Sequence, residues 1–491
     1  MKALCVLALV VGLAGAPKPA AASSPEAAAE IDAFIRRAMV EIETVPGLSI
    51  AVVQGDAVVM TAGYGVADVV TRRPVDADTR FYIASATKSF TALAFAARAT
   101  RGELDLDAPL SRTYPDSGMS LDIARSTSLT DLLAHRSGLS NDPLTFRYAY
   151  SGDAGPETMR RLAAETRRDE ETPPGVFRYS NLGYNLATTL AGGDWRALVQ
   201  DEILTPAGLS QTTASIAEAG RTGVLALGHF GDQADGPRVS PLQKTDATMH
   251  SAGGLVSTAH DMARWLELQL NDGVIDGERV FPGGLVASTH EMRVGQDRRF
   301  GDYHRDGYGL GWNLGSYRGE RLVHHFGNFS GSRAHVSFMP DRRIGVAVMV
   351  NEDLAAGELA DVVANHVYDR LLNRPDLAEA SDDAIAGLRA RRDRRRSALA
   401  AARSERASRP WRLSRPLSSY AGIYDSARMG TLRLKATPDG LEATMGPLRA
   451  LAEPYDEAET VRVELVPLQG ETLRFEGRDR LIFAGEAFQR R

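Results

Sequence analysis

Two periodicities alternate along the chain, and their order predicts how its elements assemble. Short runs rich in β-branched and apolar residues, bounded by turn residues, predict strands near the N-terminus and again after residue 300. These strands are expected at residues 48–54, 57–65, 308–312, 321–331, 333–339 and 344–350. Between about residues 103 and 300 the pattern is mostly helical, with long loops. Strands at both ends with helices between them predict one antiparallel sheet that joins remote parts of the sequence and is covered by helices.

Three helices with an apolar face are predicted around this sheet. The first has its face on Ile31, Phe34, Ile35, Met39 and Ile42, and another is expected near residues 354–372. The third follows Ser85, because Phe90, Leu93, Ala94 and Ala97 recur at helical spacing. Arginines in the last turn of this third helix and Gly102 after it are a usual stop signal.

The pattern changes twice after residue 375, which suggests further domains. Residues 376–410 contain a run of arginines embedded in alanines, and we interpret them as a solvated linker helix, although a basic stripe can also bind acidic partners. Residues 411–491 hold short strands separated by turns such as Pro438-Asp-Gly440, which predicts a small antiparallel barrel. With 491 residues, the chain is long enough for these domains and for a main domain over 25–375.

Composition and charge narrow the function. A net charge of −6 argues against general nucleic-acid binding. Residues 1–22 resemble an export signal: Lys2 provides a positive start, residues 3–15 are apolar but too few to span a bilayer, and small residues follow. The single cysteine, Cys5, would leave with that signal, so the mature protein would contain neither a disulfide nor a reactive thiol. We therefore expect an exported protein, periplasmic or secreted, with no stable membrane span.

Ser85 and Lys88 form the first candidate catalytic pair. They lie three residues apart at the start of a predicted helix, so the lysine amine can reach the serine hydroxyl. A serine becomes a good nucleophile only when a base takes its proton, and an amine can act as that base once burial lowers its pKa. Only five of the 57 basic residues are lysines, and Lys88 alone has a serine three positions before it. Because arginine cannot serve as a base, the rarity of lysine in this chain favours a chemical role for Lys88. The alternative is a serine that caps the helix beside a surface lysine, which would give the same short pattern.

Two later segments contain further candidates. Tyr179-Ser-Asn181 lies where a Pro-Pro-Gly turn leads into a helix, so the tyrosine and the asparagine can point the same way; a buried tyrosine beside a helix cap is the alternative. His325-Phe-Gly327 lies on a predicted strand. His135, at the end of another predicted helix, is interpreted as a packed or helix-terminal histidine, with a role as ligand or base as the alternative. We interpret residues 251–266 as scaffold.

These motifs, in this order, resemble those of the serine β-lactamase and penicillin-binding-protein superfamily. The similarity is greatest to the peptidase-type branch that includes class C β-lactamases, D-Ala-D-Ala carboxypeptidases, D-aminopeptidases and related esterases, and it covers residues 30 to 372. The tail resembles, more weakly, a lipocalin-like barrel found in some family peptidases. The resemblance implies an α+β fold with a central antiparallel sheet, terminal helices, an inserted helical subdomain and a small all-β barrel.

The resemblance also implies roles for individual residues. Ser85 would be the acylated nucleophile, Lys88 and Tyr179 would share the proton transfers, and Asn181 would hydrogen-bond the substrate. The backbone N–H groups of Ser85 and Asn328 would form the oxyanion hole. His325 and Gly327 would contribute to substrate binding, and no metal or other cofactor is implied.

Histidine at position 325 departs from the lysine that β-lactamases usually carry in the third motif. A histidine has an unperturbed pKa of about 6.5, so a permanent positive charge for a β-lactam carboxylate is not expected there at neutral pH. A tyrosine at the start of the middle motif likewise implies no acidic residue that activates the deacylation water. Within the family, this pattern resembles the aminopeptidase and esterase members, and we expect weak or no β-lactamase activity.

The sequence therefore predicts an exported serine hydrolase acting on amide or ester bonds of D-amino-acid-containing peptides or of small esters. The alternative is a non-catalytic penicillin-binding-type sensor or scaffold that uses the same cleft to bind cell-wall fragments. A metallohydrolase built on His324 and His325 is disfavoured, because adjacent strand residues point to opposite faces. Small-molecule or peptide substrates are the expected partners, and oligomers could form through the C-terminal barrel.

Overall fold

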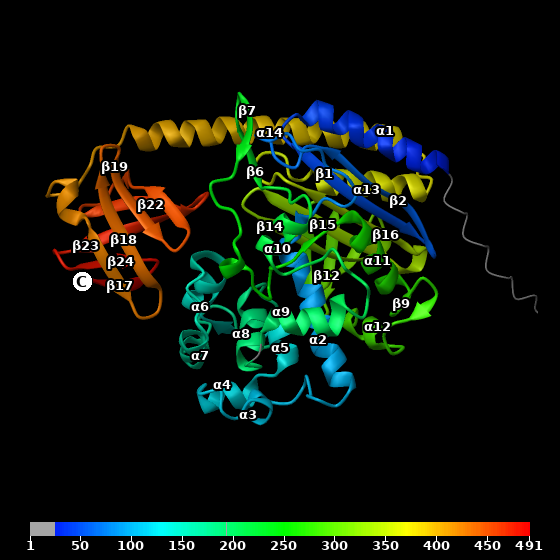
Figure 1. Ribbon diagram of the computed structural model, residues 1–491, viewed down its shortest axis with the longest axis horizontal. Helices are drawn as coiled ribbons and strands as arrows, with labels where there is room; N and C mark the ends of the chain where they lie inside the picture. The colour runs from blue at the N-terminus through cyan, green and yellow to red at the C-terminus, as the bar shows by residue number, and fades with distance from the viewer. Residues whose placement is uncertain (1–24, 193) are drawn as a thin grey trace, which may run out of the picture.

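The computed structural model describes residues 25–192 and 194–491 of the chain. The predicted export signal, residues 1–22 with Lys2 and Cys5, lies outside the described residues. The described part forms a large lobe and a small β lobe, joined by one long helix that runs along the top of both in Figure 1. Within it, no helix is both long enough and apolar enough to cross a bilayer.

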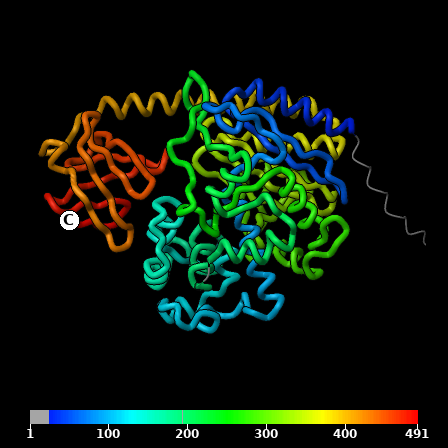
Figure 2. The backbone as a smooth tube through the Cα atoms, viewed as in Figure 1, coloured from blue at the N-terminus to red at the C-terminus, as the bar shows by residue number. Residues whose placement is uncertain are grey.

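The large lobe is built on an eight-stranded antiparallel sheet in the order β11-β12-β13-β14-β15-β16-β1-β2. Its strands are β1 (Gly47–Gln54), β2 (Ala57–Gly65), β11 (Val294–Phe300), β12 (Tyr303–Tyr308), β13 (Asn313–Tyr317), β14 (Glu320–Phe329), β15 (Ser332–Met339) and β16 (Ile344–Val350). Leu48 of β1 pairs with Val350 of β16, so strands from opposite ends of the domain meet inside the sheet. Figure 2 shows these early and late segments side by side. The predicted fold class is thereby confirmed.

Helices cover both faces of this sheet, which explains why β15 and β16 are buried along their full length. On one face, α1 (Pro25–Ile42) and α13 (Leu359–Leu371) pack against the strand side chains that point toward them, such as Ile50 and Val348. On the other face, α2 (Thr87–Thr100), α11 (Ala259–Leu270) and α12 (Leu285–Thr289) pack against residues such as Ala51 and Ala347. The period of two along each strand therefore divides the core into two layers.

One predicted strand is wrong. Residues 308–312 were expected to be extended, but β12 ends at Tyr308 and β13 begins only at Asn313. Two glycines explain the break: Gly311 has φ 82°, and a Cβ on Gly309 would lie 2.3 Å from the carbonyl oxygen of Thr289. The apolar residues between them are buried in a turn instead of a strand.

A mostly helical subdomain is inserted between β2 and β11 and fills the lower part of the large lobe in Figure 1. Its helical segments are α3 (Leu110–Thr113), α4 (Leu121–Ser126), α5 (Leu129–Leu133), α6 (Asp142–Phe146), η2 (Arg147–Ser151), α7 (Pro156–Ala164), α8 (Leu182–Leu190), α9 (Trp195–Val199), η3 (Gln200–Leu204) and α10 (Ile216–Thr222). Small strand pairs brace its loops: β3 (Phe81–Tyr82) with β8 (Val256–Ser257), β4 (Leu139–Ser140) with β5 (Arg167–Arg168), β6 (His229–Gln233) with β7 (Gly236–Val239), and β9 (Val274–Ile275) with β10 (Glu278–Arg279).

Helix α14 (Leu377–Ala407) links the two lobes. Most of this helix is not buried, but some of its arginines also contact the large lobe. Arg392 donates to the carbonyl oxygen of Ile42 at 2.6 Å, and Arg395 forms an ion pair with Glu358. Guanidinium groups have several donors in a fixed plane, so they suit such mixed backbone and carboxylate contacts.

The small lobe is a nine-stranded antiparallel sheet that curls into a nearly closed barrel, because its β20 end comes back against β22. A short turn, η6 (Leu417–Tyr420), precedes its strands. The strands are β17 (Gly422–Ser426), β18 (Gly430–Thr437), β19 (Gly440–Met445), β20 (Leu448–Leu451), β21 (Glu453–Pro454), β22 (Thr460–Val466), β23 (Gln469–Glu476), β24 (Arg480–Phe483) and β25 (Glu486–Arg490). Leu242 of the large lobe joins the barrel's apolar core, so the two lobes are packed together.

Candidate active site

Ser85 lies in a tight turn between the large sheet and α2. The turn, η1 (Ala84–Ala86), follows β3 and leads directly into the helix. Ala84 has φ 46°, a conformation that non-glycine residues rarely adopt, and such strain is often found at functional sites. The turn is held from outside by the N–H of Ile83, which donates to the carbonyl oxygen of Leu255 at 3.0 Å. Ser85 is consequently presented at a fixed place at the helix start.

Lys88 lies one turn further along, with a fully buried side chain. Its Nζ is 3.1 Å from Ser85 Oγ, 2.8 Å from Asn181 Oδ1 and 2.7 Å from the carbonyl oxygen of Ala252. These partners are all neutral, and burial lowers the pKa of the Lys88 amine well below its usual value. The geometry therefore brings a deprotonatable amine to the serine hydroxyl, as the three-residue spacing predicts.

Tyr179 completes the group around Ser85. Lys88 Nζ lies 4.8 Å from the centre of its ring, and its hydroxyl takes part in a hydrogen bond with Ser85. The residue is 41% exposed, and the burial that remains raises the pKa of its hydroxyl, while the contact with Ser85 lowers it. The phenol is protonated at neutral pH, so it can pass a proton only if another group replaces it.

Asn181 connects the middle motif to Lys88. It occupies the position before α8, and its side-chain oxygen accepts from the lysine. A substrate contact by this residue would therefore use its amide nitrogen.

Strand β14 brings the third motif against the serine turn. A Cβ on Gly327 would lie 2.0 Å from the carbonyl oxygen of Ile83, so only glycine allows this approach. β14 pairs with β13 only as far as His324, which leaves its last five residues without a β13 partner. Asn328, the expected second oxyanion donor, lies on this exposed end.

His325 points into the same cleft, but both of its ring nitrogens have protein partners. Nδ1 lies 2.9 Å from the carbonyl oxygen of Phe326, and Nε2 lies 3.2 Å from the hydroxyl of Tyr308. The ring is 6.0 Å from that of Tyr179. Burial, followed by the nearby Lys88, lowers the pKa of His325 well below its usual value, so the imidazole is neutral.

A second histidine, His135, contacts the same Tyr308 hydroxyl as His325. His135 Nε2 is also 3.2 Å from the Tyr308 hydroxyl, and His135 Nδ1 accepts the backbone N–H of Ser180 at 3.3 Å. Burial likewise lowers the pKa of His135, whose ring lies 4.6 Å from that of Tyr179. The two histidines and Tyr308 thus form a buried frame around the candidate catalytic tyrosine.

The hydrogen bonds determine which group donates and which accepts at each contact of this frame. Because Ser180 donates to His135 Nδ1, the neutral His135 must carry its proton on Nε2 and donate it to Tyr308. Because a carbonyl faces His325 Nδ1, that nitrogen must carry the proton, and Nε2 is left to accept from Tyr308. The chain therefore runs from Ser180 through His135 and Tyr308 to His325, and a proton added to either ring breaks one of its bonds.

The sequence motifs indicate Ser85, Lys88, Tyr179, Asn181, His325, Gly327 and Asn328, and the structure brings the first six together, with Asn328 following Gly327 on β14. The sequence motifs do not indicate two further contributors, Tyr308 and the carbonyl oxygen of Ala252, which lies in a segment interpreted as scaffold. Tyr308 contacts His135, a buried histidine on a distant element with which it shares no spacing. The tight Gly253-Gly254 turn was the available signal for Ala252.

The described residues contain no group of three or more potential His, Cys, Asp or Glu ligands arranged for a metal ion. His324 and His325 face opposite sides of β14: His324 Nε2 is 3.0 Å from Arg305 Nε, whereas His325 contacts Tyr308.

Comparison with known proteins places these features in context. The family described as Beta-lactamase matches residues 32–368. Unguisins hydrolase ungD' from Aspergillus campestris is 25% identical over 348 residues, which cover 67% of this chain but only 62%, less than two thirds, of that relative.

Two solved structures share the fold. The octameric penicillin-binding protein homologue from Pyrococcus abyssi has a TM-score of 0.59 and 21% identity, covering 94% of this chain and 99% of the other. D-amino acid amidase from Ochrobactrum anthropi SV3, complexed with L-phenylalanine amide, has a TM-score of 0.56 and 23% identity, covering 70% of this chain and 98% of the other.

Proposed function

The chain belongs to the Beta-lactamase family, and from this premise we propose that it is a serine hydrolase that cleaves amide or ester bonds through an acyl-enzyme on Ser85. The substrates we propose are peptides or amides that contain D-amino acids, or small esters. Similarity to a D-amino acid amidase and to a hydrolase of unguisins supports this class.

The observation that carries the proposal is the contact between Ser85 Oγ and the buried amine of Lys88 at 3.1 Å. Lys88 has no carboxylate among its three hydrogen-bond partners, so no ion pair opposes the lowering of its pKa by burial. A neutral amine in this position can take the serine proton as the oxygen attacks a carbonyl carbon.

The remaining steps follow from the neighbouring groups. The N–H groups of Ser85 and Asn328 would hold the oxyanion, each contributing about 3 kcal/mol to the transition state. Tyr179 would pass a proton to the leaving nitrogen or oxygen and be reprotonated by the Lys88 ammonium. A water would then attack the acyl-enzyme and give one proton to the neutral Lys88 amine, which would pass it to Ser85 Oγ as the acyl product leaves.

A neutral His325 supports the choice of substrate. Its two nitrogens are held by Tyr308 and Phe326, so it offers no cation for the carboxylate of a β-lactam. We therefore propose weak or no β-lactamase activity, as the sequence suggests.

Active-site labelling tests the nucleophile. Purified protein is treated with a fluorophosphonate or a fluorescent penicillin, and peptide mass spectrometry locates the adduct. The expected result is an adduct on the Ser85 peptide that is absent in Ser85→Ala. Equal labelling in Ser85→Ala, or no adduct with either reagent, would end the proposal.

Turnover separates an enzyme from a binding protein. Hydrolysis of a p-nitrophenyl ester is expected to be lost in Lys88→Ala and retained in Lys435→Ala, a lysine on barrel strand β18. A stable adduct on Ser85 without turnover would instead favour the non-catalytic sensor of cell-wall fragments.

We also propose that the protein is exported, on the basis of the apolar segment at residues 3–15. N-terminal sequencing of protein from the native host is expected to begin near residue 23, and an N-terminus at Met1 would contradict export by cleavage.

We further propose self-association through the barrel lobe, supported by the octameric homologue that shares the fold over both lobes. Light scattering of the full chain is expected to give more than one subunit, and a monomer at all concentrations would contradict this.

A further inference from the structure

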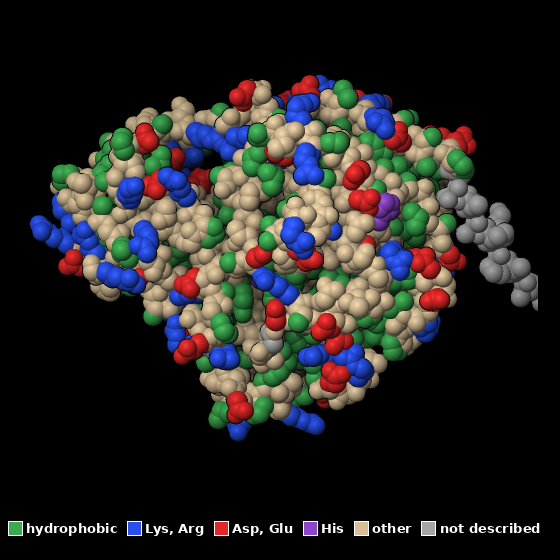
Figure 3. All heavy atoms as spheres, viewed as in Figure 1, with side chains coloured by type: hydrophobic (Ala, Val, Ile, Leu, Met, Phe, Trp, Pro, Cys, Tyr) green, Lys and Arg blue, Asp and Glu red, His purple; other side chains and the backbone are tan. Residues whose placement is uncertain are grey.

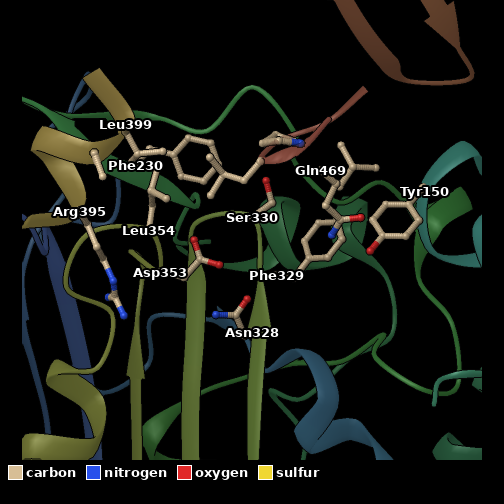
Figure 4. A pocket seen from close by; sticks show the side chains of 14 residues that line it. Tyr150, Phe230, Asn328, Phe329, Ser330, Asp353, Leu354, Arg395, Leu399 and Gln469 are labelled. Carbon is tan, nitrogen blue, oxygen red and sulfur yellow. The ribbon is translucent and has the colours of Figure 1, made fainter. Parts of the chain in front are cut away.

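A pocket of about 520 Å³ lies where the two lobes meet, next to the end of β14. Figure 4 shows its walls: Asn328, Phe329 and Ser330 at the end of β14, Leu399 and Arg395 on α14, and Gln469 of the barrel. Figure 3 shows that the surface is hollowed between the two lobes below α14. Asn328 belongs both to this pocket and to the proposed oxyanion hole, so the pocket adjoins the catalytic cleft.

The barrel contributes the turn between β22 and β23 to this pocket. Val466 pairs with Gln469, which leaves Pro467 and Leu468 at the tip. Leu468 has φ 64°, a conformation that favours glycine at this place in a turn, and 48% of the residue is exposed. A strained, exposed leucine has no stabilising role in the barrel, and it faces the pocket instead.

Contacts with the large lobe hold this turn in place. Burial raises the pKa of Tyr150, against which a hydrogen bond with the Gln469 side chain acts, and the Tyr150 ring stacks on Phe329 at 5.9 Å. Phe329 directly follows Asn328, so the position of the barrel is coupled to the edge of β14 within three contacts. Leu468 N–H also donates to Glu464 at 2.6 Å, which fixes the turn from the barrel side.

One carboxylate in the pocket is available to a ligand. Asp353 Oδ1 accepts the N–H of Gly331 at 2.5 Å, and Figure 4 shows its side chain pointing into the pocket from the large lobe. Arg395 also lines the pocket, but its guanidinium is paired with Glu358 and with the carbonyl oxygen of Ala355. The pocket therefore combines apolar walls with the carboxyl group of Asp353, and Arg395, the arginine that lines it, is already paired.

We propose that this pocket is a substrate subsite for an acyl group that carries an apolar side chain and a free protonated amine, with Asp353 binding the amine and Leu468 contacting the side chain. This inference rests on the proposed hydrolysis at Ser85. It assigns to the barrel a direct part in specificity and favours N-terminally free aminoacyl substrates over N-blocked ones.

The protonation of Asp353 fits this role. Burial and the neighbouring Glu352 raise its pKa to about 7, and Glu358 acts in the same direction, while the Gly331 hydrogen bond and Arg333 act against them. Arg395 faces the same space from α14. An ammonium beside the carboxyl would stabilise its charged form, so an amine is recognised best between about pH 7 and pH 8, where Asp353 is ionised and an α-amine is still protonated.

The test compares substrates that differ only in the amine. Leucine p-nitroanilide of D and of L configuration is compared with the 4-methylpentanoyl p-nitroanilide, which has the same shape without the amine, and with the N-acetyl derivatives. The expected kcat/KM of the wild type is about 10- to 100-fold higher for an amine-bearing substrate. This preference should rise from pH 6 to pH 8.

Two variants attribute the preference to the pocket. Asp353→Asn keeps an acceptor for Gly331 and is expected to remove the amine preference and its pH dependence, measured as the ratio of kcat/KM for the amine-bearing and the amine-free substrate. Leu468→Asn, which tolerates a positive φ, is expected to lower kcat/KM for leucyl substrates relative to alanyl ones. The control Asp235→Asn removes the same charge from the exposed turn between β6 and β7 and should behave as the wild type.

The outcomes separate the two proposals. A Ser85 adduct and normal turnover, with a preference that is absent in the wild type or unchanged in Asp353→Asn, would overturn the subsite alone. A preference for the N-acetyl substrates would overturn it as well. No adduct and no turnover of any substrate by the wild type would overturn the hydrolase proposal, and the subsite with it.

Discussion

The hydroxyl of Tyr308 lies 3.2 Å from Nε2 of both His135 and His325. One phenol thus joins two imidazoles that come from the helical subdomain and from the central sheet. A hydroxyl has a single proton, so it can donate to only one of the two rings and must accept from the other. The backbone partners of the rings decide which, and the result is a neutral chain with no place for an additional proton.

Removal of the Tyr308 hydroxyl is expected to lower both activity and stability. In Tyr308→Phe, His135 Nε2–H and His325 Nε2 both lose their partner while remaining buried, which should cost about 1–3 kcal/mol in the free energy of unfolding. With the chain broken, His325 Nε2 loses the donor that keeps the ring neutral and can accept a proton, so the acid limb of kcat/KM should move to higher pH. Urea unfolding and a pH–rate profile provide the two measurements.

The control for this change is Tyr317→Phe. Tyr317 is also a buried tyrosine of the same sheet, but its hydroxyl donates to Asp369, away from the cleft. The Tyr317→Phe variant should lose stability, but the acid limb of its kcat/KM profile should not shift. An unshifted profile in Tyr308→Phe would show that the frame around Tyr179 is structural only.

Replacement of Lys88 by arginine is expected to abolish the base while keeping a cation. Burial lowers the pKa of the lysine, so that its neutral form is accessible, whereas a guanidinium stays charged. We expect kcat/KM to fall about 10²- to 10⁴-fold in both Lys88→Arg and Lys88→Met, and to be unchanged in Lys435→Arg. Near-normal activity in Lys88→Arg would mean that the positive charge is what Ser85 requires.

Much of this arrangement was predictable because it is local. Ser85 and Lys88 share one helical turn, and the alternating strands at both ends of the domain can bury both faces only in one sheet. The contacts that were not predictable join elements far apart in the chain, such as His135 with Tyr308 or Gln469 with Tyr150. Neither pair has a spacing rule, since each depends on how a whole lobe or subdomain docks. Leu468 is an intermediate case: a leucine after a proline in a two-residue turn violates a local preference, and such a violation can indicate a site.

A half-buried histidine away from the cleft, His290, gives a measurable pH effect on stability. Burial lowers the pKa of His290 to about 3, with Arg321 acting in the same direction and Asp272 against it. The unfolded chain has a histidine pKa of about 6.5, so it binds this proton first as the pH falls, and the folded state loses stability. Between pH 7.5 and pH 5 this group should cost about 2 kcal/mol.

The difference in the free energy of unfolding between the wild type and His290→Gln isolates the contribution of His290. His290→Gln cannot titrate, so its loss of stability from pH 7.5 to pH 5 should be smaller than that of the wild type by up to about 2 kcal/mol. His260→Gln, at an exposed histidine, is the control for the substitution itself. Parallel curves for the wild type and His290→Gln, measured by urea unfolding at both pH values, would contradict the assignment.

Gly327 offers a test of how closely β14 must approach the serine turn. An alanine Cβ there would lie 2.0 Å from the carbonyl oxygen of Ile83 and 3.1 Å from the Cβ of Ala84, so the strand or the turn must move. A displacement of about 1 Å at the oxyanion hole is enough to cost on the order of 100-fold in rate. We expect Gly327→Ala to lose at least this much in kcat/KM, whereas Gly295→Ala on β11, where a Cβ meets no atom within 4 Å, should be as active as the wild type. Fluorophosphonate labelling should slow in parallel with turnover, because both reactions need Ser85 and the β14 edge in register. A variant that folds, labels and turns over normally would show that the proposed pair of backbone donors is not set by this contact.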